Sequence, residues 1–122
     1  MLGDCLFPVI LGSNTEGHAC ACRLRRSYGI GSTVLTGKRA LAMRFVPQVQ
    51  LIFAPATLSD EVLLSILQDL YHQSGLRLPL LALCDPAYEG FLTRNRAELE
   101  ARFILRRGGD ILGGHYDRTT TF

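Results

Sequence analysis

An uninterrupted apolar segment over residues 6–11, Leu-Phe-Pro-Val-Ile-Leu, leads directly into a glycine-containing turn and the start of a helix. Apolar and polar residues do not alternate in it, which is typical of a strand buried on both faces of a parallel sheet. A second such segment covers residues 78–84, and shorter strands are expected at 32–35, 49–53 and 103–105. Together with helices between them, these strands predict an α/β fold, a Rossmann-like open, mainly parallel sheet of about four to five strands with helices on both faces.

The first helix is expected directly after the first strand. Ser13 and Glu16 form an S-x-x-E capping box, and Asn14 is a competing N-cap residue. Gly17 falls on the face that is expected to be buried, so the first turn of the helix can lie close to the sheet. Gly29 is placed to end the helix in a left-handed conformation.

Two further helices are expected from the later part of the chain. Leucine and isoleucine residues at helical spacing predict one helix over residues 60–73. Another is predicted over residues 86–102, because Asp85 is a good N-cap and Pro86 suits the first helical position. Asn95 is polar within the apolar face of this helix, which predicts a bend or a break there.

The chain has 122 residues, which fit one domain. This domain is expected to cover residues 1–105. Residues 106–122 contain four glycines and three consecutive threonines, and they are expected to form either an extension packed on the domain or a truncated linker. Residues 38–47 are expected to be irregular or to contain one short helical turn.

The net charge of +2 is small and evenly spread, which argues against a nucleic-acid partner. No apolar stretch reaches the roughly 18–20 residues that a membrane span needs. The N-terminus also lacks the basic and apolar regions of a secretory signal. We therefore expect a cytoplasmic protein that binds neither nucleic acid nor membranes.

The pair Cys20 and Cys22, with His18 nearby, invites comparison with a metal site. In a helix, however, side chains two positions apart point about 200° away from each other, so these two thiols cannot coordinate the same metal ion. No metal site is therefore predicted. In a reducing compartment the four cysteines are expected to remain thiols.

Two segments carry candidate substrate-binding residues, each directly after a predicted strand. Gly12, Ser13 and Asn14 follow the first strand, and Asp85 and Tyr88 follow the fourth. Ligands of open α/β sheets bind beyond the carboxyl ends of the strands, so all five are expected at one edge. The alternative is structural: the polar residues cap their helices and the tyrosine faces the core.

The turn over residues 12–17 lacks the middle glycine of a G-x-G-x-x-G fingerprint, and no Walker lysine follows it. This argues against a dinucleotide site and favours contact with part of a small polar substrate. No histidine has a recognisable nucleophile partner, and no two carboxylates have a spacing that assigns acid and base roles. The sequence therefore predicts no catalytic residue and no cofactor in this chain.

Two stretches resemble a known family. Residues 7–35 are similar to the opening of the carboxylate–amine ligases of the ATP-grasp superfamily, which include bacterial D-aspartate ligase. The shared features are an apolar strand, a glycine turn, a small-residue helix ending in Tyr-Gly-Ile, and a second strand. Residues 80–105 resemble a later strand of that family, with an Asp-x-x-Tyr helix start and an Asn-Arg-x-x-Leu segment. The resemblance implies the pre-ATP-grasp domain, the Rossmann-like N-terminal unit of these ligases.

In complete members a larger ATP-grasp domain follows, which binds ATP and Mg²⁺. The enzyme phosphorylates a carboxylate, and an amine attacks the acyl phosphate. The resemblance thus implies a domain that is inactive alone, lines the cleft for a small carboxylate substrate and partners an ATP-grasp domain. Because the tail after residue 105 departs from the family, the chain is expected to be a fragment or to be naturally short or diverged. The alternative is a standalone Rossmann-like binding or interaction module, for which a homodimer is one option.

Overall fold

The computed structural model describes residues 5–37 and 46–113, which form a five-stranded sheet whose neighbouring strands are all parallel. The strand order is β3-β2-β1-β4-β5. The expected Rossmann-like open sheet is therefore confirmed. The strands are β1 (Leu6–Leu11), β2 (Ser32–Thr36), β3 (Val49–Phe53), β4 (Leu78–Leu83) and β5 (Ile104–Arg107).

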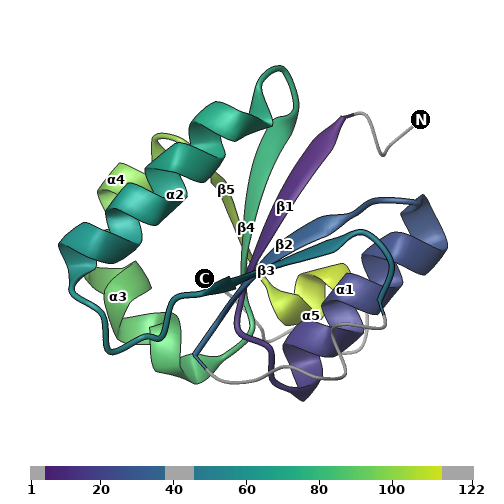
Figure 1. The fold of residues 1–122 in the computed structure, drawn as a ribbon, viewed down its shortest axis with the longest axis horizontal. Coiled ribbons are helices and arrows are strands. Elements are labelled where there is room, and N and C mark those ends of the chain that lie inside the picture. The colour runs from purple at the N-terminus through teal and green to yellow at the C-terminus, as the bar shows by residue number, and fades with distance from the viewer. Residues whose placement is uncertain (1–4, 38–45, 114–122) are drawn as a thin grey trace.

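Helices cover both faces of the sheet, as expected (Figure 1). One side carries α1 and the short α5, and the other carries α2, α3 and α4 (Figure 1). The helical elements are α1 (Thr15–Tyr28), α2 (Asp60–Ser74), the 3₁₀ turn η3 (Pro86–Tyr88), α3 (Glu89–Arg94), α4 (Arg96–Glu100) and α5 (Gly108–Ile111). None of the helices in the described ranges is long and apolar enough to cross a membrane.

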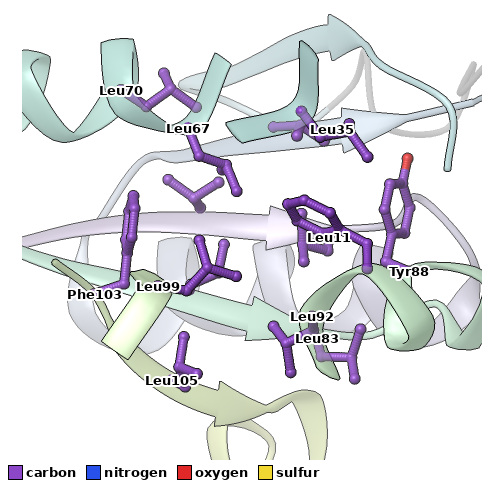
Figure 2. Close-up of a cluster of buried hydrophobic side chains, with 14 of the residues drawn as sticks. Leu11, Leu35, Leu67, Leu70, Leu83, Tyr88, Leu92, Leu99, Phe103 and Leu105 are labelled. Carbon is purple, nitrogen blue, oxygen red and sulfur yellow. The ribbon is translucent and has the colours of Figure 1, made fainter. Parts of the chain in front are cut away.

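Strand β1 lies at the centre of the sheet and contributes to a hydrophobic core on each side. Val9 and Leu11 belong to the cluster under α2, whereas Ile10 belongs to the cluster under α1. All residues from Phe7 to Leu11 are buried, and complete burial of such a side chain stabilises the fold by about 1.5–3 kcal/mol. This two-sided burial explains why the segment is apolar without alternation. Figure 2 shows the larger cluster, in which Leu11, Leu35, Leu83 and Leu105 of the sheet lie with Leu67, Leu70, Leu92, Leu99 and Phe103.

The N-cap of α1 is Asn14, the second of the two candidates in the sequence. Its Oδ1 accepts a hydrogen bond from the Gly17 N–H at 3.0 Å. Ser13 is not the cap, because its hydroxyl is hydrogen-bonded to the hydroxyl of Thr36 at 2.6 Å. At the other end, Gly29 adopts the expected left-handed conformation with φ 68°.

The third predicted helix is divided, as the position of Asn95 indicates. Asp85 caps its first turn, with Oδ1 accepting from the Ala87 N–H at 3.0 Å. At the break between α3 and α4, the Asn95 side-chain amide donates to the Phe91 carbonyl at 2.9 Å and to Asp60 Oδ2 at 3.0 Å. The break thus ties this segment to the start of α2.

The last strand is longer than predicted. β5 begins at Ile104 and continues to Arg107, where it pairs with the end of β4. α5 follows directly and contacts α1, and the Cys20 thiol of α1 donates to the Gly108 carbonyl at 3.4 Å. Residues 106–113 therefore pack on the domain. Most of the 38–47 segment and the rest of the tail lie outside the described residues.

Candidate functional site

The carboxyl ends of β1 and β4 meet at the point where the strand order reverses. β2 lies on one side of β1 and β4 on the other, so the connections after β1 and β4 leave the sheet in opposite directions. The Leu11 carbonyl accepts from the backbone N–H groups of Cys84 and Asp85, at 3.1 and 2.9 Å. Such a switch point is the usual ligand position in an open α/β sheet.

Gly12 makes the close approach of these two segments possible. Its φ is 117°, and a Cβ at this position would collide with the Asp85 Cβ and lie 2.9 Å from the Asp85 nitrogen. The space beside Gly12 is therefore filled by Asp85. Gly17 is similar, since its Cβ would collide with the Gly12 carbonyl oxygen. These glycines admit neighbouring protein atoms, whereas a phosphate-binding turn would leave that space to a ligand.

Asn14 joins the two candidate segments through its side chain. While its oxygen caps α1, its Nδ2 donates to the Cys84 carbonyl at 3.1 Å. Both ends of the amide are thus used within the protein. Of the two roles considered for this residue, the structure assigns the helix cap and adds a link between the turn and the end of β4.

A pocket of about 190 Å³ opens at this edge. It brings together three of the predicted site residues, Ser13, Asp85 and Tyr88, with Gly37, Ala56 and Ala87. Gly12 and Asn14 lie beside it in the same turn but do not line it. Sequence reasoning missed Gly37 and Ala56, although Gly37 comes just after the second predicted strand and shares the edge for that reason.

Tyr88 lines the pocket, but most of the residue, including its hydroxyl, belongs to the core. The residue is only 2 % exposed, and its hydroxyl donates to the Ala54 carbonyl at 2.7 Å. Burial, together with the negative charge of Asp85, raises the pKa of Tyr88 to about 12. The ring lies in the cluster under α2 (Figure 2). Its hydroxyl is therefore committed to the fold.

The thiol of Cys84 lies next to the site but on the α1 side of the sheet. It donates to the Cys20 sulfur at 3.6 Å. This hydrogen bond and burial raise the pKa of Cys84 far above its usual range, and the charges of Glu16 and Asp85 act in the same direction. A nucleophilic cysteine needs a lowered pKa. Cys84 is accordingly a packing residue.

A larger cavity of about 580 Å³ lies at the opposite, amino-terminal edge of the sheet, lined by residues that include Phe7, Ser32, Gln50 and Arg77. The Arg77 guanidinium lies 4.7 Å from the Phe7 ring centre, and its Nε donates to the Ser74 carbonyl at 3.2 Å. The Arg77 side chain thus binds the C-terminal end of α2. Because ligands of open sheets bind at the carboxyl edge, we take the smaller pocket as the candidate site.

The smaller pocket, at the carboxyl edge, can bind a ligand through hydrogen bonds. Among the described residues that line it, Asp85 is the only charged one, and Ser13 and Tyr88 carry hydroxyls, of which that of Tyr88 is bonded to the Ala54 carbonyl. Within residues 5–37 and 46–113, no group of three or more His, Cys, Asp or Glu side chains could hold a metal ion.

Comparison with protein-family models, curated proteins and solved structures gave no match. The resemblance to the pre-ATP-grasp domain stays a prediction.

Proposed function

We propose that this chain is the N-terminal, substrate-cleft domain of an ATP-dependent carboxylate–amine ligase. The observation that carries this proposal is the meeting of the two motif segments, through the Asn14–Cys84 hydrogen bond and the shared pocket lined by Ser13 and Asp85. The two stretches that resemble the family therefore meet at one pocket, which supports the proposal. It lies at the edge where open α/β sheets bind ligands, and its volume suits one end of a small substrate.

ATP does not fit the residues of this pocket. The carboxylate of Asp85 repels phosphate groups, and the turn at Gly12 is filled by Asp85 where a pyrophosphate would need open space. In the proposed ligase, ATP and Mg²⁺ therefore belong to the ATP-grasp domain that partners this chain. The chain alone is expected to bind substrate weakly and to be inactive.

The proposal is tested by following the backbone amide signals of the ¹⁵N-labelled chain by nuclear magnetic resonance. Small amino acids are expected to shift the signals of Ser13, Gly37, Asp85 and Ala87 in a saturable way. ATP with Mg²⁺, and NAD, are expected to cause no saturable shift, and the chain is expected not to hydrolyse ATP. Saturable binding of either nucleotide at residues 12–17 would contradict the proposal.

A second candidate is a standalone binding or interaction module. It is favoured by the packing of residues 106–113, since β5 extends to Arg107 and α5 contacts α1. Light scattering after size exclusion distinguishes the two candidates. A stable homodimer that binds no small ligand at the carboxyl edge would support the module, whereas a monomer with a saturable site supports the ligase domain.

A further inference from the structure

The chemistry of the carboxyl-edge pocket is dominated by hydrogen-bond acceptors. Asp85 accepts one hydrogen bond from the Ala87 N–H through Oδ1 at 3.0 Å. An ionised carboxylate has about four acceptor positions and no donor. The described structure shows no hydrogen bond to Oδ2, so this side chain retains acceptor capacity at the pocket.

The hydroxyl pair beside Asp85 adds to this acceptor capacity. Ser13 Oγ and Thr36 Oγ1 lie 2.6 Å apart, and either can be the donor. A hydroxyl oxygen can accept two hydrogen bonds. Ser13, which lines the pocket, therefore has an acceptor position left in either arrangement.

Among the described residues that line the pocket, the one charged side chain is the carboxylate of Asp85. Burial and the nearby charge of Asp85 both raise the pKa of Tyr88, which also lines the pocket. Arg107 ends the neighbouring strand at the same edge of the sheet. Its Nη2 donates to Glu89 Oε2 at 2.9 Å, so its charge is paired with a carboxylate.

We infer that this pocket takes the ammonium or hydroxyl end of a small ligand, and not its carboxylate, an inference that rests on the proposed function of the pocket as part of the substrate cleft. A cationic or hydroxyl donor is attracted to the acceptors of Asp85 and Ser13, whereas a carboxylate is repelled by Asp85. The amine substrate of a carboxylate–amine ligase has this chemistry. The carboxylate substrate expected from the family resemblance is then bound elsewhere in the complete cleft.

Two small probes distinguish the two ligand chemistries on the ¹⁵N-labelled chain. Ethanolamine, protonated at neutral pH, presents an ammonium and a hydroxyl, and acetate presents only a carboxylate. Ethanolamine is expected to shift the amide signals of Ser13, Asp85 and Ala87 in a saturable way, whereas acetate leaves them unchanged. Both titrations are made at constant ionic strength, because exposed charges are screened by salt.

The variant Asp85→Asn tests the role of the carboxylate. The asparagine keeps an oxygen that can accept from the Ala87 N–H, so the helix start is retained. It is expected to bind ethanolamine at least about tenfold more weakly, as loss of a charge-assisted hydrogen bond predicts. Asp69→Asn changes the net charge equally on the exposed surface of α2, and it is expected to bind ethanolamine as the unaltered chain does.

The outcomes separate the inference from the proposed function. Saturable shifts with acetate but not with ethanolamine would overturn the inference and leave the pocket as a substrate site. Equal weakening by Asp85→Asn and Asp69→Asn would also overturn it, because the effect would then be one of net charge. No saturable shift with either probe, or with any small amino acid, would refute both the inference and the proposed function.

Discussion

Replacing Gly12 by alanine tests the contact that closes the candidate site. The φ of 117° at this position disfavours any side chain, which adds about 1–3 kcal/mol of backbone strain. The new Cβ would also collide with Asp85, and overpacking of this kind adds about 1–3 kcal/mol. The two effects together predict a loss of about 2–6 kcal/mol, a large part of the roughly 5–15 kcal/mol that stabilises a typical domain.

The matched control is Gly29→Ala at the C-cap of α1. Gly29 also has a positive φ, 68°, but a Cβ there meets no atom within 4 Å. Only the left-handed conformation is penalised, by about 1–2 kcal/mol. Urea unfolding followed by circular dichroism gives the free energy of unfolding of both variants. If Gly12→Ala loses no more than Gly29→Ala, the close packing of Asp85 against the turn is refuted.

Three further predictions concern single side chains around the site. Asn14→Ala removes a helix cap and a half-buried amide donor, so the free energy of unfolding is expected to fall by about 1–3 kcal/mol, whereas Asn14→Asp keeps the cap and is expected to lose less. With Ellman's reagent in native buffer, the exposed Cys5 is expected to react and the buried pair Cys20 and Cys84 only after unfolding, so fast modification of Cys84 would contradict its raised pKa. Tyr88 is expected to ionise near pH 12, as the difference in absorbance at 295 nm between the unaltered chain and Tyr88→Phe should show. Its raised pKa stabilises the fold fully below pH 10, and that contribution is lost as the pH rises towards 12, so a Tyr88 signal already complete at pH 10 would refute the argument.

The parts of the fold that depend on local sequence could be predicted. Asp85 followed by proline defines a helix start whatever surrounds it, because the carboxylate caps the next amides and the ring fixes φ. Asn95 interrupts an apolar face, and its amide competes for a backbone carbonyl, as the bond to Phe91 shows. The burial of β1 on both faces could likewise be predicted, because its residues are apolar without alternation.

The details that depend on distant partners could not be predicted. Ser13 and Asn14 are both good caps, and the choice between them is made by Thr36, at the end of β2, and by Cys84, directly after β4. The end of β5 is also set by pairing, because Arg107 continues the strand only where Leu83 offers a backbone partner. Such contacts join residues far apart in sequence, so single-sequence patterns do not contain them.

The meeting of the candidate residues at one edge of the sheet was predictable, but their individual contacts were not. Parallel strands bring their carboxyl ends together, which places Asp85 with the turn at residues 12–14. The filling of the space beside Gly12 by Asp85 depends on the exact spacing of β1 and β4. Tyr88 is a similar case. Its position in the predicted helix indicated a ring that faces the core, but its hydrogen bond to the Ala54 carbonyl could not be predicted, because Ala54 is distant in the sequence.

The central position of β1 has a consequence for how the chain acquires its fold during synthesis. β1 pairs with β2, which follows soon after it, but its second neighbour β4 comes after more than half of the chain. Until Leu83 has been made, one edge of the most apolar strand has no partner, and exposed strand edges of this kind are prone to wrong pairing. The carboxyl-edge pocket is completed by the same late pairing, so ligand binding at this edge should begin only once the sheet has closed around β1.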